Sequence, residues 1–212
     1  MKPPRSGAVS LAQLFLLMLG LLLSVSTASA QKIKHVVIDA GHGGRDPGAQ
    51  TGYGQDEKLL AMDLAQRLEK ILKAKGIRTT MTRSTDVKIP NEDRAAIANA
   101  IPDCVLVSLH FNSHGDRSIS GIESFYFPGS VESEKLCRFI QGELGRRVVT
   151  RNRGAKPRSD LVVLNKSEGP AVLVECGFIS HRWESQRCNS TWFRQVLAEE
   201  IAQALVRYIS QP

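Results

Sequence analysis

Four side chains that can hold or assist a metal ion stand at the ends of expected structural elements. His42 lies in the glycine-rich segment IDAGHGGRDPGAQ, His110 ends the apolar run VLVSLH, and Glu175 ends the run AVLVE. Glu57 opens an expected helix, EKLLAMDLAQRLEKILKAKG. Open α/β sheets build their sites at the carboxyl ends of strands, and two histidines with two glutamates are the components of a catalytic zinc site. These residues therefore predict a metal-dependent hydrolase.

Glu57 continues the inward stripe of its expected helix. Ala61 and Leu64 follow it at spacings of four and seven residues, so its carboxylate is expected to point toward the core. An unpaired buried charge costs several kcal/mol, and a metal ion would supply the missing partner. The alternative is a surface Glu57 that only caps the first turn, where the helix dipole contributes about 0.3–1 kcal/mol.

His42 and His110 differ from the other histidines in their neighbours. Glycines around His42 let the backbone turn tightly and bring a ligand close, and His110 ends a buried strand where an imidazole needs partners. The histidines without such settings are His35, His114 and His181. Because the helical HExxH motif is absent, the ligands must come together from separate elements.

Three further residues are candidates for supporting roles. Asp39 could orient a ligand histidine by a hydrogen bond to its ring without contacting the metal, or it could simply end its strand as a turn residue. Asn112 could hydrogen-bond a substrate or cap the loop after His110. Arg153 belongs to a basic run without intervening acids, which is either a solvated face or a surface that binds substrate carboxylates. The run comprises Arg146, Arg147, Arg151, Arg153, Lys156 and Arg158.

Strand and helix patterns alternate along the chain. Expected strands cover 33–39, 77–83, 103–110, 121–127, 161–164 and 171–175. Expected helices cover 57–75, 90–100, 132–149 and 191–209, with a basic loop after the third. Such alternation predicts an α/β fold: a single domain with a mostly parallel, twisted sheet, helices on both faces, and the zinc site at the carboxyl ends of the strands.

The first thirty residues have the pattern of a secretory signal peptide. Lys2 and Arg5 give a basic start, residues 11–25 are apolar, and residues 28–30 read Ala-Ser-Ala, a small-residue cleavage site. An uncleaved anchor is the alternative, although the apolar run is short for a membrane span. We therefore expect an exported protein, periplasmic or extracellular, with a mature domain of 31–212 and no stable membrane span.

The composition and charge of the chain limit the classes of partner that it is expected to bind. The formal charge of +7 falls to +5 without Lys2 and Arg5, a modest excess that favours anionic partners. Nucleic acid is not an expected partner, because aromatic residues make up only 6% and no recognition-helix pattern occurs. A monomer is expected. Four cysteines could pair in three ways or remain buried hydrophobes: Cys104, Cys137, Cys176 and Cys188.

Taken in order, several of these segments resemble a known enzyme family. The stretch IDAGHGGRDPGA, the helix-opening Glu57, the RxxxAN segment at 94–99, SLHFN and LVECGFIS resemble the zinc-dependent N-acetylmuramoyl-L-alanine amidases of type 3, across the whole mature chain. The resemblance implies that His42, Glu57 and His110 hold one zinc ion and that Glu175 is the catalytic glutamate. It also implies that the substrate is peptidoglycan, cut between the lactyl group of N-acetylmuramic acid and L-alanine.

Other interpretations stay open. A catalytically inactive wall-binding or regulatory module on the same fold is expected to have lost a ligand or Glu175, and this chain retains all four residues. A zinc peptidase acting on soluble peptides would carry the same kind of site. Glu175 could also close the site as a fourth ligand, although closed zinc sites are mostly cysteine-rich. Division-associated relatives carry an extra blocking helix, and the segment 127–160 has little room for one, which predicts a site that needs no activator.

Overall fold

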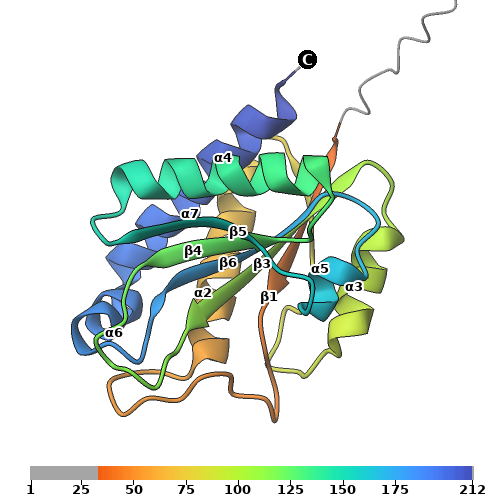
Figure 1. The fold of residues 1–212 in the computed structure, drawn as a ribbon. Coiled ribbons are helices and arrows are strands. Elements are labelled where there is room, and N and C mark those ends of the chain that lie inside the picture. The colour runs from red at the N-terminus through yellow and green to blue at the C-terminus, as the bar shows by residue number, and fades with distance from the viewer. Residues whose placement is uncertain (1–32, 212) are drawn as a thin grey trace, which may run out of the picture. The chain divides into compact units, whose positions relative to one another are not determined.

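The centre of the structure is a six-stranded sheet in the order β2-β1-β3-β6-β4-β5, seen in a computed structural model that describes residues 33–211 (Figure 1). The strands are β1 (His35–Ala40), β2 (Arg78–Met81), β3 (Cys104–Asn112), β4 (Ile122–Tyr126), β5 (Asn152–Pro157) and β6 (Ala171–Phe178). All pairings between these strands are parallel except that of β4 with β6. The predicted α/β class with a mostly parallel sheet is confirmed. The expected signal peptide lies outside the described residues.

The antiparallel pairing of β4 with β6 reverses the chain direction within the sheet. The carboxyl ends of β1, β3 and β6 therefore lie at the same end of the sheet as the first residues of β4 and β5. We call this end the carboxyl edge of the sheet. In Figure 1 this edge faces downward, where the loops after β1 and β3 approach each other. As a result, residues that start β4 and β5 reach the same edge as the expected metal ligands.

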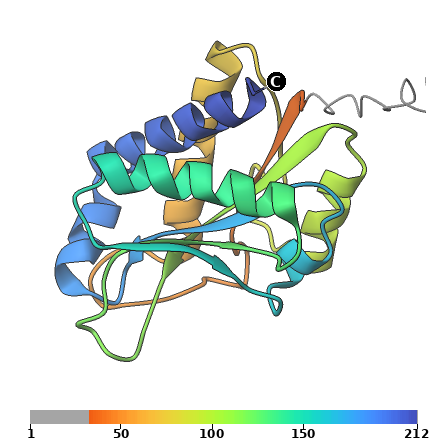
Figure 2. The ribbon, with the colours of Figure 1, turned by 45° about the horizontal axis from the view of Figure 1, so that its top comes forward.

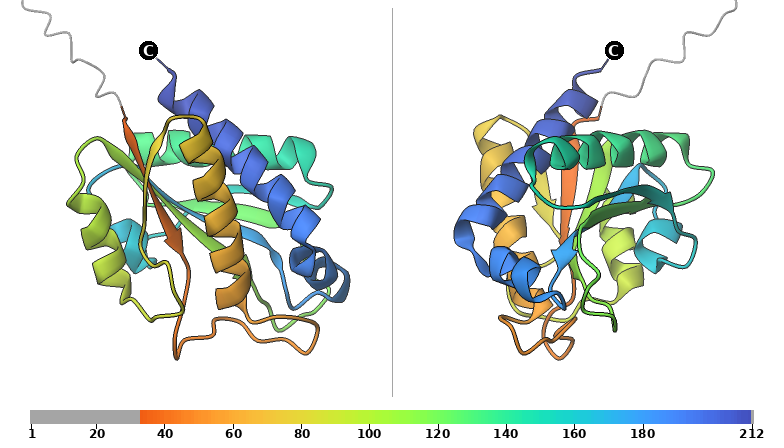
Figure 3. Two further views of the ribbon diagram at one scale, coloured as in Figure 1. Left: turned by 180° about the vertical axis from the view of Figure 1, so that it is seen from behind. Right: turned by 60° about the vertical axis from the view of Figure 1, so that its left-hand side comes forward.

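Helices cover both faces of the sheet, as predicted (Figure 2). One face carries α2 (Glu57–Ala74), α4 (Val131–Arg147) and α7 (Thr191–Ile209), and Figure 3 shows α2 and α7 running side by side. The other face carries α3 (Asn91–Asn99) and α5 (Val162–Asn165), while α6 (Arg182–Asn189) follows β6. Within 33–211, none of the helices combines the length and apolar character that a membrane span requires.

The alternation of β-strand side chains divides the apolar residues between two cores. Val36 and Ile38 of β1 join the larger core beneath α2 and α7, whereas Val37 joins the smaller core on the side of α3 and α5. Leu64 and Leu68 of α2 are fully buried in the larger core, and each contributes about 1.5–3 kcal/mol by leaving water. The cysteines of the described residues are buried free thiols, so the alternative of disulfide pairing is not observed.

Two expected elements are wrong, and one helix is missed. The expected strand at 161–164 is largely the one-turn helix α5, because a short apolar run does not distinguish a strand from a buried helix. The expected basic loop contains β5, an edge strand that pairs with β4 alone and whose residues are half-buried or exposed, so the sequence shows no apolar strand pattern there. The missed helix is α6, which is polar and short.

Candidate metal centre

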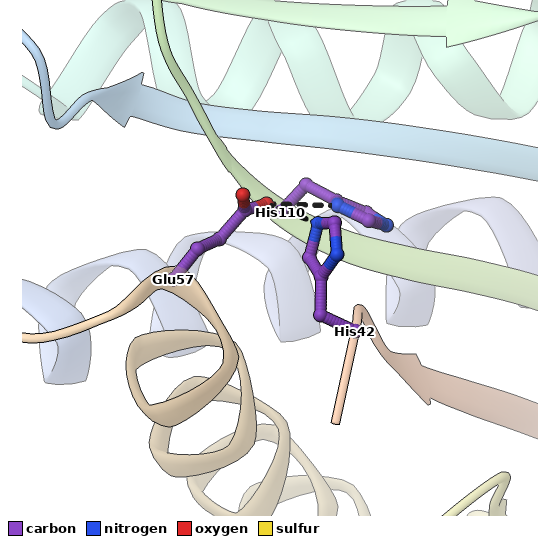
Figure 4. Close-up of side chains that lie close together, drawn as sticks. All are labelled: His42, Glu57 and His110. Atoms are coloured by element: carbon purple, nitrogen blue, oxygen red, sulfur yellow. Dashed lines mark hydrogen bonds and ion pairs between the residues drawn. The ribbon is translucent and has the colours of Figure 1, made fainter. Parts of the chain in front are cut away.

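His42, Glu57 and His110 meet at the carboxyl edge of the sheet (Figure 4). The Glu57 Oε1 atom lies 3.0 Å from Nε2 of His42 and 2.9 Å from Nδ1 of His110. The two imidazole rings meet edge to face, with centroids 4.9 Å apart. One potential ligand atom from each residue lies within 4.8 Å of the others, and no other described group of histidine, cysteine and acidic residues does so.

Glycines make the close approach of these side chains possible. A Cβ atom on Gly41 would lie 2.4 Å from Cε1 of His110. A Cβ atom on Gly48, whose φ is +68°, would lie 2.6 Å from Oε2 of Glu57. His42 itself has a φ of 59°, a left-handed conformation that is uncommon outside glycine. The segment from β1 to α2 is therefore a tight loop shaped around the three side chains.

Glu57 points inward, as its helical stripe predicts, and does not act as a surface cap. Its side chain is buried; Oε1 accepts a hydrogen bond from the Phe111 amide at 3.0 Å, and Oε2 accepts one from the Ala49 amide at 2.8 Å. Burial alone would raise the pKa of Glu57, but the hydrogen bonds and charges of His110 and His42 hold it well below its ordinary value. Glu57 is therefore an anion, as a metal ligand must be.

Asp46, which the sequence analysis missed, is the carboxylate that orients His42. Its Oδ1 atom lies 3.0 Å from Nδ1 of His42, which leaves Nε2 directed at Glu57. Metal-binding histidines commonly donate their second ring N–H to such a carboxylate, which fixes the tautomer and the ring orientation. The available signal was the spacing of four residues from His42 within the same glycine-rich loop.

Asp39, expected as a candidate for that role, contacts no histidine. Its carboxylate accepts hydrogen bonds of 2.6 Å from Thr82, Ser108 and Arg94. Asp39 is buried on β1 in register with Ser108, two residues before His110 on β3. The sequence placed an acid correctly beside the glycine turn, but the partner of His42 is the acid on the far side of that turn.

Glu175 stands beside the centre on β6. It pairs in register with His110 of β3 on one side and with Glu123 of β4 on the other, so the three side chains share one face of the sheet. Its Oε2 atom is enclosed and has no hydrogen-bond partner among the described residues. Burial, followed by the charges of Glu57 and Glu123, raises the pKa of Glu175 well above its ordinary value.

The donor set fits a zinc ion with an open coordination position. Two imidazoles and one carboxylate are ligands found in catalytic zinc sites, which leave a position for water or substrate. A buried carboxylate oxygen without a partner is costly, and the orphaned Oε2 atom of Glu175 lies at the side of this donor set. A cation with a water molecule beside Glu175 would remove that cost.

Glu123 is a second residue beside the centre that sequence reasoning missed. This buried acid at the start of β4 accepts a hydrogen bond from Nδ2 of Asn112 at 2.9 Å through Oε1. Its Oε2 atom lies 3.1 Å from Nε of Arg153 and also pairs with Lys156. The two expected substrate-binding residues, Asn112 and Arg153, therefore meet on one carboxylate beside Glu175. The signal was the alternation in GIESFYF, but the face depends on the reversed direction of β4.

An open, mostly parallel α/β sheet with a His–Glu–His donor set at the carboxyl ends of its strands is the arrangement expected of a metal-dependent hydrolase. The sequence profile of the N-acetylmuramoyl-L-alanine amidase family matches residues 36–207. The chain therefore belongs to the type 3 N-acetylmuramoyl-L-alanine amidases and is an enzyme that acts on peptidoglycan, which confirms the resemblance and the predicted enzyme class.

Individual relatives agree with this family. The Bacillus subtilis protein YqiI, named as uncharacterized, is 36% identical over 91% of this chain and 94% of its own. The probable cell wall amidase LytH of Staphylococcus epidermidis is 30% identical over 84% of this chain, which spans 60% of that relative. The name of LytH describes that relative as a probable cell wall amidase.

Solved structures share the fold. The N-acetylmuramoyl-L-alanine amidase of Clostridium difficile 630 superposes with a TM-score of 0.80 at 33% identity, over 85% of this chain and all of that one. The CwlD amidase of Clostridioides difficile, solved in complex with the GerS lipoprotein, gives a TM-score of 0.78 at 28% identity, over 84% and 98% of the two chains.

Proposed function

We propose that this chain is a zinc-dependent amidase that hydrolyses the bond between the lactyl group of N-acetylmuramic acid and the L-alanine of the peptide stem. The observation that carries the proposal is the partnerless buried oxygen of Glu175 beside the His–Glu–His donor set. Family membership supports the same bond and the same substrate.

The ligand roles follow from the directions of the ring nitrogens. His42 would hold zinc through Nε2 and His110 through Nδ1, the atoms that face Glu57, while Glu57 would contribute a carboxylate oxygen. When bound, zinc supplies Lewis-acid polarisation of the scissile carbonyl and lowers the pKa of a water molecule. Asp46 accepts the remaining N–H of His42, so the imidazole stays in one tautomer throughout the reaction.

Glu175 is proposed as the general base and then the general acid. It accepts a proton as water attacks the lactyl carbonyl and returns a proton to the nitrogen of the leaving L-alanine. Its Oε2 atom has no hydrogen-bond partner among the described residues, so it is free to take up and return that proton. A Glu175 that closed the coordination shell would leave no group for this transfer.

The cleavage products test the proposed function. Purified 31–212, supplied with zinc and no other protein, is expected to release from isolated sacculi peptides with a free N-terminal L-alanine and leave glycan strands intact. Mass spectrometry of the digest checks this outcome, and free stem peptide in a parallel digest should remain uncut. New reducing sugar ends, or cuts within the stem, would assign the chain to a different activity, including that of a soluble zinc peptidase.

The same digest tests whether an activator is required. Between β4 and β5 the structure holds α4 and, in this described segment, no second helix that could enter the centre. We propose that the site is open without an activator. A chain that is inert alone and becomes active with an exported partner protein would overturn this part of the proposal.

We propose that Asn112 and Arg153, which both contact the Glu123 carboxylate, also contact the substrate. The Arg153 side chain is 22% exposed, and the Lys156 side chain is 40% exposed. Two cations share one carboxylate here, so the group of Arg153, Lys156 and Glu123 carries a net positive charge. Guanidinium groups bind carboxylates through paired N–H donors. This junction can therefore hold a carboxylate of the peptide stem.

Arg153→Ala is expected to raise KM for muropeptides with free stem carboxylates by about tenfold and to leave kcat nearly unchanged. A charge-assisted hydrogen bond contributes roughly 1.5–3 kcal/mol, and tenfold corresponds to about 1.4 kcal/mol. Steady-state kinetics with free and amidated stem carboxylates measure the effect, and Arg151→Ala, at an exposed position of the same basic run, is the control. An equal KM change with both substrates would contradict carboxylate binding.

The location and the oligomeric state of the protein are also proposed. We propose that the protein acts outside the cytoplasm, that residues 1–30 are removed as a signal peptide, and that the mature chain from residue 31 is a single monomeric domain. The cell-wall location of the substrate and the Ala-Ser-Ala cleavage pattern support export. N-terminal sequencing of the exported chain identifies the cleavage site.

A further inference from the structure

Two buried arginines lie behind the loop that carries His42. Arg83 and Arg94 are 3% and 2% exposed, although a guanidinium group is costly to bury. Arg94 donates from Nη1 to the Asp39 carboxylate at 2.6 Å and to the Ala40 carbonyl at 2.7 Å. Its Nη2 donates to the carbonyl of His42 itself at 2.7 Å. Arg94 therefore joins the end of β1 to the backbone of an expected metal ligand.

Arg83 extends this arrangement to the second ligand-bearing segment. Its Nε donates to the Ala40 carbonyl at 2.8 Å, and its Nη2 donates to the Gly41 carbonyl at 2.8 Å. The same Nη2 donates to the Lys58 carbonyl at 2.9 Å, one residue after Glu57. Together the two arginines bind the carbonyls of residues 40, 41 and 42 and connect them to the first turn of α2.

The loop needs such support because its conformation is strained. His42 has a φ of 59°, and a non-glycine residue persists in this region only when its surroundings hold it there. Each buried guanidinium group satisfies several carbonyls that would otherwise lack donors. Within 33–211, neither arginine donates a hydrogen bond to an imidazole ring, so both act on His42 through the backbone.

We propose that Arg83 and Arg94 are positioning residues that hold the His42 loop, residues 41–56 between β1 and α2, in its metal-binding conformation. The proposal rests on the proposed zinc function of the centre. In this role neither arginine contacts the metal or the substrate. Lysine retains the charge but lacks the planar fork that reaches two carbonyls at once. Arg94→Lys and Arg83→Lys therefore remove the backbone restraint and preserve the buried positive charge.

The test measures zinc affinity rather than activity alone. Zinc titration against a competing chelator is expected to show a dissociation constant about 10–100-fold higher in Arg94→Lys and in Arg83→Lys, the usual effect of losing support behind a ligand. The absorption spectrum of the cobalt(II)-substituted protein should also change, because the His42 ring is less well fixed. Saturating zinc should restore most of the amidase activity.

A third buried arginine is the matched control. Arg194 on α7 is 5% exposed, pairs with Asp63 and donates to the Cys188 carbonyl at 2.7 Å, and none of these partners belongs to the His42 loop. Arg194→Lys should lower the melting temperature of the metal-free protein by about as much as Arg83→Lys and Arg94→Lys do. It should leave the zinc dissociation constant and the cobalt spectrum unchanged.

The outcomes distinguish arginines that position the His42 loop from arginines that only stabilise the fold. Unchanged zinc affinity in a folded Arg94→Lys and a folded Arg83→Lys overturns the proposal, as does an equal affinity loss in Arg194→Lys. If a lysine variant does not fold, Asp39→Asn serves instead, because it weakens the anchoring of Arg94 and keeps both arginines; unchanged affinity there also overturns the proposal. A native chain that binds no zinc refutes the proposed metal function itself, which is a separate result.

Discussion

Glu175→Gln is expected to lower amidase activity by about 10²–10⁴-fold, the usual contribution of a general acid–base group, with zinc content unchanged. Glutamine occupies the same space between β3 and β4, but its amide cannot accept the proton of the attacking water. Assays on purified sacculi, together with metal analysis of the dialysed protein, measure the two effects separately. The exposed Glu168→Gln variant, seven residues before Glu175 and outside the centre, should match the unmodified enzyme.

The thermal stability of this variant distinguishes a catalytic role from a structural one. In the metal-free protein the pKa of Glu175 is raised by burial and then by Glu57 and Glu123. A carboxyl group whose pKa rises on folding costs stability once the pH exceeds its unfolded value. Glu175→Gln should therefore melt at the same or a higher temperature at neutral pH. Loss of zinc together with activity would instead identify Glu175 as a fourth ligand.

Replacing His42, Glu57 or His110 by alanine should abolish stable zinc binding, with activity falling to the level of the metal-free enzyme. In the proposed site each residue supplies one of three protein ligands, the number usual for catalytic zinc, so each variant is expected to lose zinc on dialysis. Metal analysis of the dialysed variants is expected to give close to zero zinc per chain, compared with about one in the unmodified protein.

His114→Ala is the control for these ligand variants. His114 is exposed and lies in the loop after β3, where its ring accepts a hydrogen bond only from the nearby Asp116 amide. It should keep normal zinc content and activity. Normal zinc content in the His42 or His110 variant would show that the ligand set is incorrect.

The sequence predicted the parts of the centre that depend on local pattern. The helical stripe through Ala61 and Leu64 correctly placed the Glu57 carboxylate toward the core. Apolar runs ending in His110 and Glu175 correctly indicated strands, which the structure pairs in register at these two residues, although β3 continues to Asn112 and β6 to Phe178. Helices and most strands followed from periodicity, because amphipathic spacing is a property of each segment alone.

What the sequence missed depends on the arrangement of segments in space. Hydrophobic alternation is the same for a strand running in either direction, so the reversal of β4 and the arrival of Glu123 beside Glu175 could not be inferred. The choice between Asp39 and Asp46 as the partner of His42 depends on the backbone angles of the glycine loop. The polar edge strand β5 lacked an apolar signal altogether.

The position of β5 also has a consequence for self-association. An outermost strand exposes unpaired backbone N–H and C=O groups that can recruit a strand from another chain and begin aggregation. Here that strand carries Arg153 and Lys156, contains Gly154 at a φ of +86°, and ends at Pro157, which has no N–H to donate. Charge, local irregularity and proline all discourage strand addition. The two cations at the Glu123 carboxylate therefore also protect the sheet edge against polymerisation.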